Sequence, residues 1–90
     1  KESFNKGQRH FINKEFDEAI GAYTQAIESD PSYPDAYNNR GAAYAAEGEV
    51  DKAIEDYNEA IALDPAYPAA YYNRGISYAN KKQYDKAIND

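Results

Sequence analysis

A period of 34 residues constrains this chain more than any other feature of its sequence. Residues 34–56 match residues 68–90 at 13 of 23 positions, and residues 1–33 match residues 35–67 at 12 of 33. The 90 residues therefore hold about two and two-thirds copies of one unit, which we place at 1–33, 34–67 and 68–90, the last being incomplete. A fixed period of this length is the signature of one array whose stacked units share a continuous core.

Each unit has the pattern of two helices joined by a turn. Pro34 and Pro65 mark the ends of the middle unit, and Gly48 interrupts it halfway, as a glycine after a helix C-terminus does. Between them, apolar residues recur at spacings of three and four, which is one face of a helix. We predict helices over 2–14, 16–29, 35–47, 50–63, 69–82 and from 84 to the end.

The apolar residues are of an unusual kind for a globular core. Sixteen are alanine and ten are tyrosine, whereas leucine and valine occur once each. Small residues with interspersed rings favour helices that pack closely, with aromatic side chains filling the spaces between them. The absence of cysteine excludes disulfides and thiolate metal sites. No apolar run approaches the length that membrane insertion requires, and no signal peptide is visible.

The pattern resembles the tetratricopeptide repeat family. Its signature is a small residue and aromatics on the first helix, then alanine, an aromatic, alanine and a final proline on the second. The middle copy carries it as Tyr37, Gly41, Tyr44, Ala53, Tyr57, Ala60 and Pro65, and the last copy as Tyr71, Gly75, Tyr78 and Ala87. The first copy has Gly7, Ala19, Tyr23, Ala26 and Pro31, but departs from it at Ser3 and His10. The resemblance implies an all-α, right-handed solenoid that binds proteins, with the first helices lining a concave groove.

The two kinds of helix differ in charge. The chain has a net charge of −6, yet the predicted first helices sum to +4 and the second helices to −11. The inner wall is therefore expected to be neutral to mildly basic, and its protein or peptide partner neutral or acidic rather than basic. An alternative is that the acids only solubilise the convex back and that the bases pair with them. The overall acidity argues against nucleic acid as a partner.

The first helices also carry a strip almost free of charge on the side away from the signature residues. Such a strip indicates contact with a partner, because solvent-facing surfaces usually carry Lys and Glu. The candidate groove residues are Phe4, Asn5, Gln8, Asn38, Asn39, Ala42, Tyr72, Asn73 and Ile76. In the alternative interpretation, Phe4, Phe11 and Ile12 pack against a preceding repeat.

Asn5, Asn39 and Asn73 recur at the full period. A carboxamide offers both a donor and an acceptor, which suits the backbone of an extended peptide. The resemblance implies the same role, since family members use asparagines here to hold the main chain of a ligand. The alternative is that these amides bond the backbone of a neighbouring helix. Arg40 and Arg74 follow directly, and we expect both to be half-buried and to reach acids on an adjacent second helix.

Some members of the family bind the C-terminal carboxylate of heat-shock chaperones through two lysines, two asparagines and an arginine. The corresponding positions here are Phe4, Gln8, Asn39, Ala69 and Asn73. Only Asn39 matches, so the charge-assisted bonds of that clamp have no donors.

The sequence predicts a protein-interaction module without a catalytic site, a cofactor or a metal site. His10, the single histidine, stands where the other copies have tyrosine, and no phosphate-binding loop or nucleophile motif occurs. The alternative function is a scaffold that self-associates end to end through uncapped terminal repeats, giving a homo-oligomer. The start at Lys1 and the short last unit are expected of a piece of a longer array, and we expect a cytoplasmic location.

Overall fold

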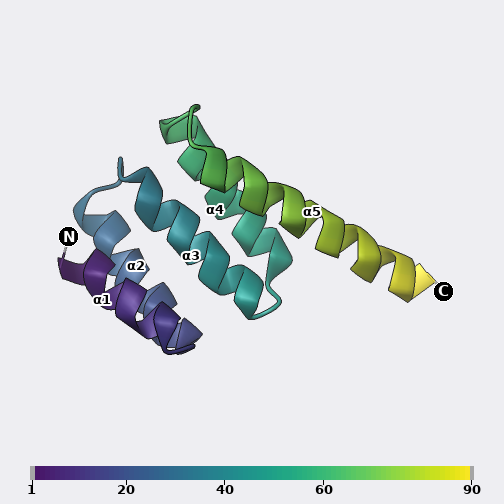
Figure 1. Ribbon diagram of the computed structural model, residues 1–90, viewed down its shortest axis with the longest axis horizontal. Coiled ribbons are helices and arrows are strands. Elements are labelled where there is room, and N and C mark those ends of the chain that lie inside the picture. The colour runs from purple at the N-terminus through teal and green to yellow at the C-terminus, as the bar shows by residue number, and fades with distance from the viewer. Residues whose placement is uncertain (1, 90) are drawn as a thin grey trace.

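The computed structural model describes residues 2–89, and the side chains of residues 2–83. Its five helices are α1 (Glu2–Ile12), α2 (Phe16–Ser29), α3 (Pro34–Ala46), α4 (Val50–Leu63) and α5 (Pro68–Asn89). Each helix packs against the next one along the chain, and α3 also contacts α1 and α5. The result is an all-α, elongated stack that measures 45 × 29 × 18 Å, with α3 at its centre (Figure 1). No helix in the described part is long and apolar enough to cross a membrane.

Aspartate and proline place the joints between successive hairpins. Asp30 caps the end of α2, and its carboxylate accepts hydrogen bonds from the backbone N–H and the hydroxyl of Ser32, at 3.1 and 2.8 Å. Asp64 makes the corresponding bond to the N–H of Ala66, at 3.1 Å. Proline then opens the following helix, where its missing N–H costs nothing. These joints explain why α2 and α4 end at the predicted residues.

The core consists of tyrosine rings seated on glycine backbones. Tyr23 and Tyr57 are 1% and 2% exposed. A Cβ built on Gly7 would lie 2.5 Å from the ring of Tyr23, and one built on Gly41 would lie 2.7 Å from the ring of Tyr57. Only glycine therefore allows α1 to approach α2, and α3 to approach α4, this closely. Alanines that are fully buried fill the remaining space, in agreement with the alanine-rich composition.

The prediction of two helices in the last unit is wrong for the described residues, because α5 continues without a break. The other hairpins turn at residues with positive φ, Lys14 at 62° and Gly48 at 83°. The corresponding residue, Lys82, is helical, and so are its neighbours. Lys82 and Gln83 are good helix formers, and a lysine with positive φ is strained. A turn at this position would therefore need a packed second helix to offset the strain, and otherwise the helix continues. The side chain of Ala87, assigned to the repeat signature, lies outside the described residues.

Two matched glycine substitutions test the close approach of the helices. Gly41→Ala places a Cβ against Tyr57 and 3.2 Å from the carbonyl oxygen of Ala53, so it should lower the free energy of unfolding by about 1–3 kcal/mol. Gly75→Ala meets nothing within 4 Å, so it should raise that free energy by about 1 kcal/mol through helix propensity. Urea unfolding followed by circular dichroism measures both. Equal effects of the two substitutions would contradict this account.

Alkaline pH should weaken the fold through Tyr57. Burial raises the pKa of this phenol to about 12, although a hydrogen bond with Ser77 lowers it in part. The folded state therefore holds the proton more tightly than the unfolded chain. The resulting stabilisation is complete below about pH 10 and is lost as the pH rises through about 12. Urea midpoints measured across this range should fall less steeply in Tyr57→Phe than in the parent chain, and parallel curves would disprove the assignment.

Candidate functional site

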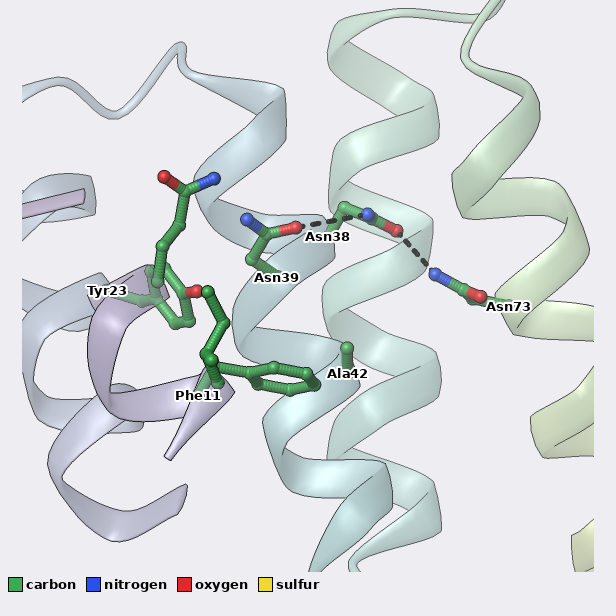
Figure 2. A pocket seen from close by; sticks show the side chains of 8 residues that line it. Phe11, Tyr23, Asn38, Asn39, Ala42 and Asn73 are labelled. Carbon is green, nitrogen blue, oxygen red and sulfur yellow. Dashed lines mark hydrogen bonds between the residues drawn. The ribbon is translucent and has the colours of Figure 1, made fainter. Parts of the chain in front are cut away.

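A hollow of about 340 Å³ lies between the first helices of the hairpins, along α1, α3 and α5. Its lining residues carry no charge, and they combine amides with apolar side chains (Figure 2). They are Gln8, Phe11, Ile12, Tyr23, Asn38, Asn39, Ala42 and Asn73. The hollow is thus a polar but uncharged surface with aromatic and aliphatic groups at one end.

Three amides form a connected row across the hollow. The side-chain Nδ2 of Asn73 on α5 donates to Oδ1 of Asn38 on α3, at 3.2 Å. The Nδ2 of Asn38 in turn donates to Oδ1 of Asn39, at 3.4 Å (Figure 2). Asn38 is 6% exposed, whereas Asn39 and Asn73 are half-buried and reach the surface. The buried amide therefore orients two accessible ones, which present further donor and acceptor atoms.

Tyrosines support this amide row from both sides. Burial raises the pKa of Tyr23, and a hydrogen bond with Asn39 lowers it in part. Burial, with a smaller contribution from a hydrogen bond to Asp35, raises the pKa of Tyr67 to about 12, whereas its hydrogen bond with Asn38 lowers it. Both phenols are neutral near pH 7, so they act here as hydrogen-bonding groups of fixed protonation.

Arg40, the cationic residue of α3, is held on the side of the helix away from the hollow. The Nε and Nη2 atoms of Arg40 donate to the two carboxylate oxygens of Asp56, each at 2.8 Å, and Nη1 donates to the hydroxyl of Thr24 at 3.2 Å. This confirms the predicted acid partner for Arg40. The prediction is wrong for Arg74, whose Nη1 donates to the amide oxygen of Asn58 at 2.8 Å. Asn58 stands one period after Thr24, so both arginines bond to the same position of the preceding second helix.

Five of the nine residues predicted for the groove line the hollow: Gln8, Asn38, Asn39, Ala42 and Asn73. Phe4 does not line the hollow, and the prediction that it is a groove residue is wrong because its side chain is buried in the core. Its side chain is 8% exposed, with its ring centroid 5.7 Å from that of Tyr23 and 5.0 Å from that of Tyr33. The loop after α2 brings Tyr33 over Phe4, which makes this phenylalanine part of the core.

Asn5, Tyr72 and Ile76 lie outside the lining of the hollow. Asn5 is exposed and takes no part in the amide row, although it shares the period of Asn39 and Asn73. The difference lies in the preceding residue, because Phe4 stands where α3 has the amide of Asn38. Tyr72 and Ile76 are 71% and 44% exposed on α5.

Phe11, Ile12 and Tyr23 line the hollow but were not among the predicted groove residues. Phe11 and Ile12 lie on the same uncharged strip of α1, but the alternative of packing against a preceding repeat kept them out of the predicted groove set. Phe11 packs edge-on against Phe16, with ring centroids 5.4 Å apart, while Ile12 is 77% exposed. Tyr23 gave no such signal, since its spacing places it on the buried face of α2. No group of acids and histidines suited to a metal ion occurs among the described residues.

Profiles of the tetratricopeptide repeat match residues 4–68 and 56–89. The comparison with curated proteins gives no match.

Several solved structures are similar to this one. The TPR2B domain of yeast Sti1, in complex with pHsp70, is 32% identical with a TM-score of 0.89, over 98% of this chain and 70% of that one. The first TPR of Spaghetti (RPAP3), bound to the HSP90 peptide SRMEEVD, is 33% identical with a TM-score of 0.88. The match covers 94% of this chain and 68% of that one. The crystal structure of MamA is 36% identical with a TM-score of 0.86. The match covers 97% of this chain and 51% of the MamA chain.

The amide row gives a matched pair of substitutions. Asn38→Ala removes a buried group and leaves the amides of Asn39 and Asn73 without their shared partner, so it should lower the free energy of unfolding by about 1–3 kcal/mol. Asn5→Ala, at the exposed amide of α1, should change it by less than about 0.5 kcal/mol. Thermal unfolding of both variants is the measurement. A neutral Asn38→Ala would show that the row does not hold α3 and α5 together.

Proposed function

The chain belongs to the tetratricopeptide repeat family, and we propose that it is a protein-interaction module that holds an extended segment of a partner protein in the hollow along α1, α3 and α5. The observation that carries the proposal is the amide row, in which Asn38 orients Asn39 and Asn73 toward the open side. Similar domains have been solved with bound peptides, which supports this class of ligand. The module acts by binding rather than by catalysis.

Hydrogen bonding accounts for the binding of a main chain. An extended peptide presents alternate N–H and C=O groups along its length, and a carboxamide can pair with both. Because Asn39 and Asn73 are fixed by a shared buried partner, little side-chain entropy is lost when a ligand binds. The row therefore supplies affinity that does not depend on the partner's sequence.

Apolar side chains at the two ends of the groove supply selectivity. Phe11 and the exposed Ile12 lie at the α1 end, and Tyr72 and Ile76 are exposed on α5. Rings of this kind give large contact area at low entropic cost. We propose that two apolar residues of the partner contact these ends, and that Phe4, being buried, takes no part.

The uncharged lining of the hollow favours a neutral partner segment over a charged one. The lining residues are uncharged, and Arg40 is already paired with Asp56 on the far side of α3. The positions of a carboxylate clamp hold Phe4, Gln8, Ala69 and Asn73, none of which is cationic. We therefore propose that the segment in the hollow is internal and uncharged, rather than a chain end anchored by its carboxylate.

A charge placed in the hollow tests the proposal. A peptide selected from a random library on this chain should bind to Ala42→Arg at least about tenfold more weakly, because the new side chain fills and charges the hollow. Ala46→Arg is the control, since Ala46 is exposed one turn further along α3, outside the lining. Calorimetric titration measures both affinities. Equal losses, or none, would place the peptide elsewhere.

A further inference from the structure

Asp35 belongs to the same hydrogen-bonded network as the amide row, although it does not line the hollow. It stands half-buried in the first turn of α3. The hydroxyl of Tyr67, from the loop before α5, hydrogen-bonds both to this carboxylate and to the amide of Asn38. Asn38 in turn bonds Asn39 and Asn73. The carboxylate is therefore connected to both accessible amides of the hollow.

This carboxylate decides the direction of the bonds in the network. A carboxylate can only accept hydrogen bonds, so Tyr67 must donate its single hydroxyl proton to Asp35. The oxygen of Tyr67 is then left as an acceptor, so Asn38 turns its Nδ2 toward Tyr67 and its Oδ1 toward α5. The bonds in the structure have this direction, since Oδ1 of Asn38 accepts from Nδ2 of Asn73 at 3.2 Å (Figure 2).

The pKa of Tyr67 agrees with this direction. Burial is the main reason that this pKa is raised to about 12, and the hydrogen bond to Asp35 raises it further. A bond that a phenol donates favours its neutral form, whereas a bond that its oxygen accepts favours the phenolate. The hydrogen bond with Asn38 lowers the pKa of Tyr67, as a bond donated by Asn38 should.

The direction of the row determines which atom Asn73 has left for a ligand. Its Nδ2 is engaged with Asn38, whereas no described residue bonds its Oδ1, which points away from Asn38 (Figure 2). If Asn38 were reversed, its Nδ2 would face α5, and Asn73 would have to reverse as well and offer its own Nδ2. N–H and C=O groups alternate along an extended segment, so the two arrangements select different registers of the partner's main chain.

We propose that Asp35 is a positioning residue of the hollow, which acts through Tyr67 and Asn38 to make Asn73 present its carbonyl oxygen to the partner. The partner segment must then place a main-chain N–H against that oxygen. A proline or a carbonyl is rejected at this position, because neither can donate. The inference rests on the proposed function, since it names the group that the ligand of the hollow supplies.

The test replaces the main-chain N–H groups of a ligand one at a time. The ligand is a peptide selected from a random library on this chain, whose binding Ala42→Arg weakens. Each of its amides in turn is changed to an ester, which puts an oxygen in place of the N–H. Calorimetric titration of the parent chain should show one position where the ester weakens binding at least about tenfold, because two oxygens then face each other. In Asp35→Asn the same ester should weaken binding less than about threefold, because an amide can donate to Tyr67 and the row is free to reverse.

Two further variants separate positioning from a loss of charge. Glu18→Gln removes an exposed acid from the first turn of α2, as Asp35→Asn does for α3, and should leave the effect of the ester unchanged. Tyr67→Phe keeps the ring but breaks the connection between Asp35 and Asn38, so it should reduce the effect of the ester as Asp35→Asn does. Each effect compares two peptides on one variant, so a general loss of stability does not change it.

A measurement without any peptide tests the connection itself. Asp35→Asn should lower the pKa of Tyr67, which is followed by the NMR shift of its Cζ. An unchanged pKa, or an ester effect as large in Asp35→Asn as in the parent chain, overturns the role of Asp35 and leaves the proposed function standing. So does a peptide in which no ester weakens binding. A library that yields no peptide sensitive to Ala42→Arg overturns the proposed function, and this inference with it.

Discussion

The structure depends on the close approach of a tyrosine ring to the backbone of a glycine. At Gly7 and at Gly41 the ring occupies the space that a side chain would need, so two helices meet across a single aromatic layer. Most of the remaining interior is alanine, including fully buried Ala19, Ala53 and Ala60, and the larger Phe4 and Ile54 are buried beside it. A core of this kind has little depth, and its stability comes from repeating the same contact along the array.

Charge is distributed to suit that architecture. Arg40 forms a two-bond pair with Asp56, of which only 6% is exposed, and so draws the cation of α3 toward the second helices. Removing either partner would strand a buried charge, which is far more costly than the pair itself is favourable. The opposite side of α3 is left to Asn38 and Asn39, whose amides bond each other, Asn73 and the neutral phenols of Tyr67 and Tyr23. The neutrality of the hollow is therefore a consequence of where the arginine is held.

The sequence predicted the features that depend on local pattern. The bounds of α2 and α4 were correct to the residue, because Asp-Pro joints and apolar periodicity define them. It failed where a contact comes from elsewhere in the chain. Phe4 is buried by Tyr33 from a loop, and Tyr23 reaches the hollow from the far layer, which helical spacing within α1 or α2 does not reveal. The continuous α5 was missed because the break at Gly48 in the middle unit was carried over to the last unit, where Lys82 takes the place of that glycine.

The central place of α3 has a mechanical consequence for the hollow. Within the described residues, this helix contacts all four others, whereas α1 contacts only α2 and α3. In a stack of helices held together by contacts between neighbours, local unfolding begins at the ends and reaches the middle last. The part of the hollow on α3, which consists of Asn38, Asn39 and Ala42, is therefore the most rigid. The outer helices, with Ile12 on α1 and Tyr72 on α5, move more easily. In the proposed binding mode, the width of the hollow can then adjust to side chains of different size while the amides of α3 keep the partner's main chain in register.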